Sequence, residues 1–368
     1  MRKIALFAVV AAFGWLVPMS GHCEKNGHSE KEFSVSKIQW VIPFRAGGGS
    51  DTWARFVAPF LERYLPGNPT VEVINRPGGG SIRGANAYAN NVKLDGTLLL
   101  GTSASTQFPY LLGDPRVRYD YSEWRALLVY QTGGVVYATR DIFTADQSDH
   151  ILQLRQGPTK RLVYGSQGAT SIDLVPMLSF KLLGLDVKPI FGVRGRSAGR
   201  LAFERGDATI DFQTTAAYLN SVESLVSSGK AIPLYSLGAL NEAGEMIRDP
   251  VFPDLPHLAE IFTELSGSQP HGVEWDSWTA FLSAGFSAQK FVVLPADTPD
   301  YIVNAYTKAF EQMKRDPEYL ANRNRTIGAY EQIVGDAAMQ LYQFSTSVPE
   351  PATEWVKGWL RSDYGLNL

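Results

Sequence analysis

The fold is decided by residues 41–51, which read VIPFRAGGGSD. The apolar half of this stretch closes a predicted strand over residues 38–44, and the glycines that follow predict a tight turn. Apolar side chains then recur at helical spacing as far as Tyr64, with Ser50 or Asp51 as the predicted N-cap. A strand, a glycine turn and a helix start form the first unit of an α/β fold. The N–H groups at such a helix start favour an anion.

The same unit recurs along the chain. Further strands are predicted over residues 71–74, 97–101, 161–164, 187–191 and 208–212, and further helices over 81–90, 174–183, 200–203 and 299–315. The pattern at 299–315 has Thr298 or Asp297 as its predicted cap. Strands that alternate with helices predict parallel sheets covered on both faces.

A chain of 368 residues exceeds the usual length of one domain, so we expect two lobes. No Pro- or Ser-rich linker separates two halves, which indicates that strands cross between the lobes, first near residues 127–136. The predicted division is listed by residue range: lobe 1 comprises 34–134 and 286–368, and lobe 2 comprises 135–285.

Composition and motifs exclude several classes of protein. The formal net charge is −3, so there is no basic excess to bind nucleic acid. The glycine run lacks the spacing of a dinucleotide or phosphate loop, and residues 165–168 lack the spacing of a nucleophile elbow. No two of the five histidines form a zinc-type pair, and we expect His257 and His271 at the surface or in loops. We therefore predict neither a metal nor a cofactor.

The first residues predict export. Arg2 and Lys3 precede an apolar run over residues 4–17, and small residues follow it, as in a secretory signal peptide over residues 1–22. The run is shorter than the roughly 20 residues of a spanning helix, although a membrane anchor is the alternative. Cys23 is the single cysteine, and His22 before it is a poor match to a lipoprotein signal. We interpret Cys23 as incidental, with lipidation as the alternative, and expect the protein in the periplasm.

Three glycine- or hydroxyl-rich loops follow predicted strands, at residues 45–51, 102–107 and 166–171. In open α/β sheets, ligands lie beyond the carboxyl ends of strands, where such loops occur. Hydroxyl groups that can donate to a carboxylate belong to Thr102, Ser103, Ser166, Thr170 and Ser171. Arg45 lies in the first loop and Arg196 in an arginine-rich segment, and a guanidinium suits a carboxylate. Each loop alone could be a plain tight turn, but three in one chain favour a binding cleft.

An ordered series of motifs now resembles the substrate-binding proteins of the tripartite tricarboxylate transporters, the Bug (TctC-like) family. Residues 41–51 are similar to the family's PFPAGGGTD loop, and the other matching stretches are residues 75–80, 95–98, 164–168, 189–195, 206–212, 252–256 and 294–299. The series runs in family order from about residue 38 to residue 319. Each motif alone is weak, but the ordered series is specific.

The resemblance implies a type II periplasmic-binding-protein-like fold, with two α/β lobes and a ligand cleft between them. It implies that the first and third loops hold a carboxylate through backbone amides and ordered water, with Asp211 in the cleft on the opposing lobe. The complete predicted site is Phe44, Arg45, Ala46, Gly47, Gly48, Ser50, Asp51, Thr102, Ser103, Ser166, Gln167, Gly168, Ala169, Thr170, Ser171, Arg196 and Asp211. Arg45 replaces the family's usual proline, which indicates a larger or more anionic ligand.

The predicted function is that of an exported solute-binding protein that catalyses no reaction. It would capture a small carboxylate, either a di- or tricarboxylate or an aromatic acid, by closing its lobes in the Venus flytrap manner. The expected partners are the permease subunits of a tripartite tricarboxylate transporter, and the expected state is a monomer. One alternative is a periplasmic ligand sensor that feeds a two-component system. Another is an exported serine hydrolase with Ser166 or Ser103 as nucleophile, against which the lack of a well-placed histidine and acid argues.

Overall fold

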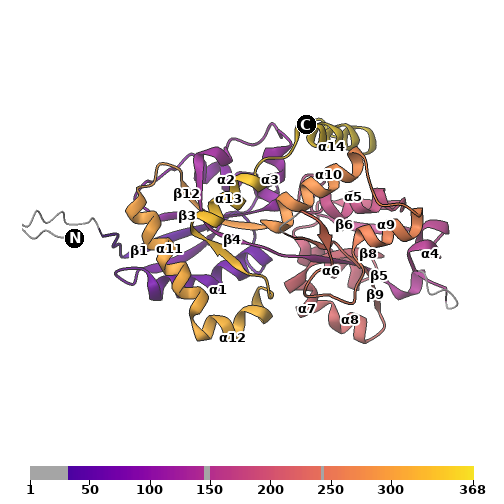
Figure 1. The fold of residues 1–368 in the computed structure, drawn as a ribbon, viewed down its shortest axis with the longest axis horizontal. Coiled ribbons are helices and arrows are strands. Elements are labelled where there is room, and N and C mark those ends of the chain that lie inside the picture. Colours follow the sequence, from indigo (N-terminus) through magenta and orange to yellow (C-terminus); the bar gives the residue numbers. More distant parts are fainter. Residues whose placement is uncertain (1–31, 145–149, 242–243) are drawn as a thin grey trace, which may run out of the picture. The chain divides into compact units, whose positions relative to one another are not determined.

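The computed structural model describes residues 32–144, 150–241 and 244–368. The predicted signal peptide at residues 1–22 and Cys23 lie outside these described residues. Residues 32–368 form one compact unit, which contains two mixed sheets with helices packed on them (Figure 1). Within the described ranges, no helix combines the length and the apolar character needed to cross a membrane.

The first sheet has six strands in the order β13-β4-β12-β3-β1-β2. Their bounds are β1 Lys37–Ile42, β2 Thr70–Asn75, β3 Leu98–Ser103, β4 Trp124–Tyr130, β12 Lys290–Pro295 and β13 Gln332–Val334. The prediction of parallel pairing holds for β1 with β2 and β3. It is wrong for β12, which pairs antiparallel with both β3 and β4 because it brings the chain back from the second sheet. Strand β13 is also antiparallel, to β4.

The second sheet has five strands in the order β7-β6-β8-β5-β9. Their bounds are β5 Gly134–Thr139, β6 Leu162–Ser166, β7 Val187–Phe191, β8 Ile210–Thr214 and β9 Ala231–Ser236. Strand β6 is parallel to β7 and β8, whereas β5 is antiparallel to β8 and β9. A separate two-stranded ribbon joins β10 Ala239–Leu240 to β11 Met246–Ile247.

The chain passes between the sheets at residues 131–133, from β4 to β5, and returns through a π-helical turn at Ser283–Ser287 that leads to β12. Gly133 in the first crossing has no room for a side chain, because Asp249 and Tyr330 occupy that space. Tyr330 donates to both carboxylate oxygens of Asp249, at 2.7 and 2.6 Å. This contact links the segment after β11 to the segment before β13, next to the crossing. The lobe boundaries themselves stay a prediction.

Helices cover both faces of both sheets, as the sequence pattern predicts. Their bounds are α1 Gly49–Tyr64, α2 Ile82–Ala89, α3 Ala104–Leu111, α4 His150–Gln156, α5 Leu174–Leu182, α6 Arg196–Glu204, α7 Thr215–Ser221, α8 Glu223–Ser227, α9 Leu258–Ser266, α10 Val273–Leu282, α11 Asp300–Arg315, α12 Pro317–Thr326, α13 Gly335–Ser345 and α14 Glu350–Tyr364. Helices α1 and α11 pack in one core against the first sheet, and α2 and α13 pack in the core on its other face. The C-terminal helix α14 packs against α10, so its apolar face belongs to the core of the second sheet.

The predicted helix caps are wrong in both cases. Helix α1 begins at Gly49 with Gly48 as its N-cap, so Ser50 and Asp51 already lie in its first turn. Helix α11 has Pro299 as its N-cap, in place of Thr298 or Asp297. For α1 the reason is visible, because the Asp51 carboxylate reaches back and accepts the N–H of Gly47 at 2.8 Å, one residue before the cap.

Candidate ligand-binding cleft

A cleft of about 610 Å³ lies where the strands of the two sheets end. From the first sheet it is lined by residues 43–50, 77–81, Arg83, Ser103, Ser105, Gln289 and Lys290, and from the second by Gln167, Ile172, residues 192–197, Gln213, Thr214 and Ala217. The first and third predicted loops therefore face one cavity. Its volume suits a small organic ligand.

The predicted site residues divide into two groups. Those that line the cleft are Phe44, Arg45, Ala46, Gly47, Gly48, Ser50, Ser103, Gln167 and Arg196. Those that do not line it are Asp51, Thr102, Ser166, Gly168, Ala169, Thr170, Ser171 and Asp211. A direct ligand contact stays a prediction for all of them. The residues of the second group lie behind the cleft lining, and the contacts of three of them show what they do there.

Asp51 shapes the first loop from behind. Its side chain is nearly inaccessible, and besides Gly47 it binds the Arg55 guanidinium at 3.0 Å. Arg55 also donates to Asn75 at 3.0 Å, and Asn75 donates to the Phe44 carbonyl at 3.0 Å. Burial alone raises the pKa of Asp51, but these hydrogen bonds outweigh it and lower the pKa overall. The carboxylate is thus held ionised as a brace for the loop.

Asp173 does the same for the third loop, and the sequence analysis missed it. This carboxylate is fully buried at the end of the loop. It accepts hydrogen bonds from the Gln167 backbone at 2.6 Å, the Tyr164 hydroxyl at 2.7 Å and the Ser166 hydroxyl at 3.2 Å. The Ser166 oxygen in turn accepts the N–H of Gly168 at 3.2 Å. The Ser166 hydroxyl therefore serves the internal structure of the loop. An aspartate just before an apolar helix was the available signal.

Arg196 lines the cleft, but its guanidinium is already paired. Its nitrogens donate to the carbonyls of Gly165 at 2.7 Å and Phe212 at 2.9 and 3.2 Å. They also contact two carboxylates, those of Asp173 at 3.1 Å and of Asp211. Although burial alone lowers the pKa of Arg196, these two carboxylates raise it overall. The Arg196 side chain is therefore charged and held in place by contacts within the second lobe.

Asp211 lies behind the wall of the cleft and has no exposed surface. Besides Arg196, it binds the Tyr137 hydroxyl at 2.5 Å and the Gln213 amide at 3.0 Å. Gln213 lines the cleft and also donates to the Arg196 carbonyl at 2.9 Å. From its place on β8, Asp211 thus positions two residues that line the cleft, Gln213 on the same strand and Arg196 on α6.

The lining of the cleft is strongly cationic. Five cationic side chains line it and no aspartate or glutamate does; the five are Arg45, Arg83, Arg194, Arg196 and Lys290. Among the residues that the structure describes, Arg45, Arg83 and Arg194 have no carboxylate within ion-pair distance, and all three are exposed. The cleft therefore contains unpaired positive charge, although the chain as a whole has a formal net charge of −3.

Lys290 is the cleft residue that the sequence analysis missed. It is the first residue of β12 and only 6% exposed. Its ammonium donates to the Gln289 side-chain carbonyl and lies 4.4 Å from the centroid of the Tyr130 ring. Burial lowers the pKa of Lys290 to about 7. In the sequence, a single lysine before an apolar strand gave no sign of burial.

The two inner histidines differ from one another. His257 is buried, so it does not lie at the surface, but it does lie in the connection before α9, whose N-cap it is. Its Nδ1 accepts the N–H of Glu260 at 3.3 Å, and the Glu260 carboxylate accepts the N–H of His257 at 2.9 Å. His271 is exposed, as predicted. Within the described ranges, no three His, Cys, Asp or Glu side chains are grouped so that they could hold a metal ion.

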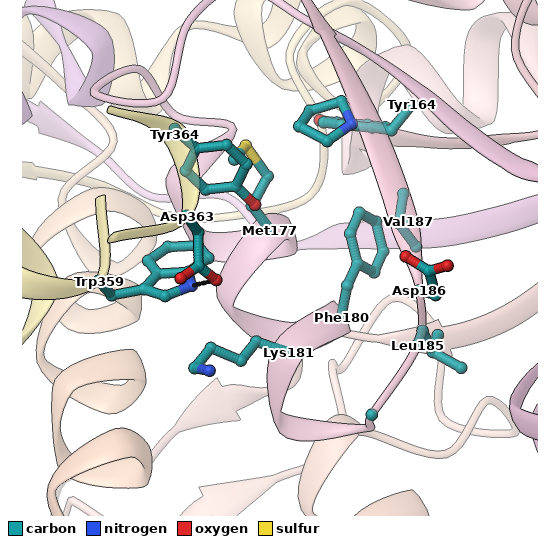
Figure 2. Close-up of a pocket in the computed structure, with 12 residues that line it drawn as sticks. Tyr164, Met177, Phe180, Lys181, Leu185, Asp186, Val187, Trp359, Asp363 and Tyr364 are labelled. Carbon is teal, nitrogen blue, oxygen red and sulfur yellow. Dashed lines mark hydrogen bonds between the residues drawn. The ribbon is translucent and has the colours of Figure 1, made fainter. Parts of the chain in front are cut away.

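A second cavity of about 320 Å³ lies between α5, β7 and α14 (Figure 2). Figure 2 shows Trp359 and Tyr364 of α14 facing Phe180 and Met177 of α5. Trp359 donates to Asp363 at 2.7 Å, within α14 itself. None of the three predicted loops contributes to this cavity, so we place the candidate site in the larger cleft.

Comparisons with known proteins bear on the family resemblance and the fold. No family model matches the chain. A stretch of 109 residues is 38% identical to Protein BugT of Bordetella pertussis strain Tohama I, which is 28% of this chain and 30% of BugT. The match thus spans less than a third of that relative.

Solved structures match over nearly the whole length. The periplasmic binding protein BugD aligns with a TM-score of 0.65 and 18% identity, covering 90% of this chain and 98% of BugD. MatC of Rhodopseudomonas palustris, solved with bound malate, aligns with a TM-score of 0.63 and 19% identity, covering 88% and 99%. The two-lobed α/β fold of periplasmic binding proteins is therefore confirmed for this chain, and so is its resemblance to the Bug and TctC-like proteins.

Proposed function

We propose that this chain, which resembles the Bug and TctC-like proteins in sequence and fold, is an extracytoplasmic solute-binding protein for a small carboxylate. The ligand would be a di- or tricarboxylate or an aromatic acid, delivered to the permease subunits of a tripartite tricarboxylate-type transporter. The observation that carries the proposal is the cleft itself, because five cations and no acid line a cavity between two lobes. Such a cavity attracts anions and repels cations.

Capture would begin with the exposed cations of the first lobe and end with closure of the lobes around the ligand. Hinge closure is the established behaviour of two-lobed periplasmic binding proteins. The crossing at residues 131–133 is a short segment on which such a hinge could turn. The fold and the predicted signal peptide both favour a periplasmic location.

The geometry favours binding over catalysis. Of the two serines considered as nucleophiles, Ser166 is buried and donates to Asp173. Ser103 lines the cleft and pairs in register with Lys290, but no histidine is among the described residues that line this cleft. A serine nucleophile needs a base within hydrogen-bond reach. We therefore propose reversible capture without turnover.

A thermal-shift screen tests the proposal. The mature protein is unfolded in denaturant, dialysed to remove any carried-over ligand and refolded. It is then heated with malate, citrate, adipate or benzoate, and with the corresponding amides as neutral controls. At an acid concentration of about 100 to 1,000 times the dissociation constant, we expect stabilisation by about 2.7–4.1 kcal/mol. A shift from an acid and not from its amide supports carboxylate capture. No shift from any acid would contradict it.

A further inference from the structure

We propose that Lys290 is the cation that holds an anionic group of the ligand at the base of the cleft, and that the cleft selects ligands with two anionic groups. One group would lie at Lys290 and the other at the loops of the lobes. This inference rests on the proposed function, because it assigns a ligand class to the same site.

The position of Lys290 supports this role. Three strands of the first sheet reach the cleft at one level, since Lys290 pairs in register with Ser103 of β3 and with Tyr130 of β4. Ser103 and Gln289 line the cleft beside it. The ammonium thus lies where the sheet ends, deeper than the exposed guanidinium of Arg45.

The partners of Lys290 leave its charge uncompensated. Its ammonium contacts one neutral amide oxygen and the face of one aromatic ring, and no carboxylate among the described residues lies within ion-pair distance of it. Five of the six buried aspartates among the described residues do have cationic partners, and the sixth, Asp249, accepts from the Tyr330 hydroxyl instead; the ion pairs are Asp51 with Arg55, Asp114 with Arg116, Asp173 and Asp211 with Arg196, and Asp316 with Arg63. An unpaired buried charge is unfavourable, so an anion that enters the cleft gains a partner that the protein itself does not supply.

The protonation of Lys290 supplies an independent signature. Burial lowers its pKa to about 7, so at pH 8 the amine is mostly neutral while the cleft is empty. The titratable group that faces it is Tyr130 of β4, whose pKa is raised by burial and which therefore stays neutral. The other cationic groups that line the same cleft are four arginines. An anion beside the amine favours its charged form, so binding should draw a proton from solvent.

The first experiment compares diacids with their half-amides by titration calorimetry at pH 6.5. The probes are malate and adipate, each against the compound in which one carboxylate is a neutral amide. We expect the wild type to bind a diacid about 10- to 100-fold more tightly than its half-amide. Lys290→Met keeps the aliphatic stem and should abolish this preference. Lys308→Met, an exposed lysine on α11 outside the cleft, is the matched control and should retain it.

The second experiment measures proton uptake, which a purely structural lysine would not change. Titrations at pH 8 in two buffers of different ionisation enthalpy give the number of protons taken up. We expect close to one proton for the wild type and for Lys308→Met, and none for Lys290→Met.

The outcomes separate the two proposals. If the wild type binds no carboxylic acid, the proposed function fails and the inference fails with it. If it binds a diacid and its half-amide equally, or a monoacid such as benzoate more tightly than any diacid, only the inference is overturned. Preference or proton uptake that persists in Lys290→Met overturns it as well. If that variant does not fold, the wild-type half-amide and proton measurements still decide the matter.

Discussion

The two walls of the cleft are built alike and charged differently. Each wall has a loop braced by a buried aspartate, Asp51 in the first lobe and Asp173 in the second. In the first lobe the brace pairs with Arg55, which does not line the cleft, so Arg45 stays unpaired at the cavity. In the second lobe the brace pairs with Arg196, which does line it.

This difference shows that lining a cleft does not make an arginine a ligand contact. What lies behind the side chain decides its role: two buried carboxylates hold Arg196, and no described carboxylate holds Arg45. We therefore expect the first lobe to supply the charge that bonds an anionic ligand, and the second lobe to supply shape and backbone donors, with its unpaired Arg194 acting only at the mouth of the cleft. Substitutions at four arginines test this difference between the lobes.

Loss of the Arg196 guanidinium should destabilise the fold. Arg196→Met leaves Asp173 and Asp211 buried without a cation, and breaking a buried ion pair on one side costs about 3–5 kcal/mol. The free energy of unfolding, measured by urea titration, should fall by that amount. Arg194→Met removes an exposed, unpaired arginine two residues away and should change it by less than about 0.5 kcal/mol. Equal stability of the two variants would mean that the walls do not differ as described.

Loss of Arg45 should weaken ligand binding and leave the free energy of unfolding almost unchanged. Arg45→Ala should weaken binding of an anionic ligand by about 1.5–3 kcal/mol, the contribution of a charge-assisted hydrogen bond. The free energy of unfolding should stay within about 0.5 kcal/mol of the wild type, because the side chain is exposed and unpaired. Calorimetry with the acid found in the thermal-shift screen measures the first quantity. Arg76→Ala, exposed on the next loop but outside the cleft, is the control. Unchanged affinity in Arg45→Ala would remove Arg45 from the site.

Much of the fold could be predicted from local patterns. The strand at 187–191 and the helix at 299–315 appear as β7 and α11 with bounds that agree to within a residue, because apolar periodicity is a local property. The antiparallel course of β12 could not be predicted in this way. It depends on where the chain returns from the other sheet, and no local pattern encodes that return.

The site divides along the same line. Glycine- and hydroxyl-rich loops identify themselves in the sequence, and both walls of the cleft contain one. The partners of Arg196 cannot be identified from the sequence in this way. Asp173 precedes Arg196 by one helix and one strand, and Asp211 follows it on β8. The pairing of β6 with β8 brings these residues together. Lys290 is the extreme case, since its burial results from β3 and β4 on either side of it.

The smallest expected effect belongs to the exposed arginines at the mouth of the cleft, Arg83 and Arg194, one on each lobe. Neither has a buried partner, so replacement by glutamine should leave stability unchanged and act only through the field that the cleft presents to an approaching anion. Such steering changes the association rate and is screened by salt, since the Debye length falls from about 10 Å at 0.1 M to about 3 Å at 1 M.

Stopped-flow binding should therefore show slower association for Arg83→Gln and for Arg194→Gln, by a factor of about 2 to 5 at low salt, with the difference lost at high salt and dissociation unchanged. Arg45→Ala should instead raise the dissociation rate at both salt concentrations, because a bonded charge is screened less than a distant one. If the Arg194 variant slowed association as much as the Arg83 variant, both walls would contribute equally to the field at the mouth. The asymmetry between the lobes would then be confined to the inner cleft, where Arg196 is paired with two carboxylates and Lys290 has no carboxylate partner among the described residues.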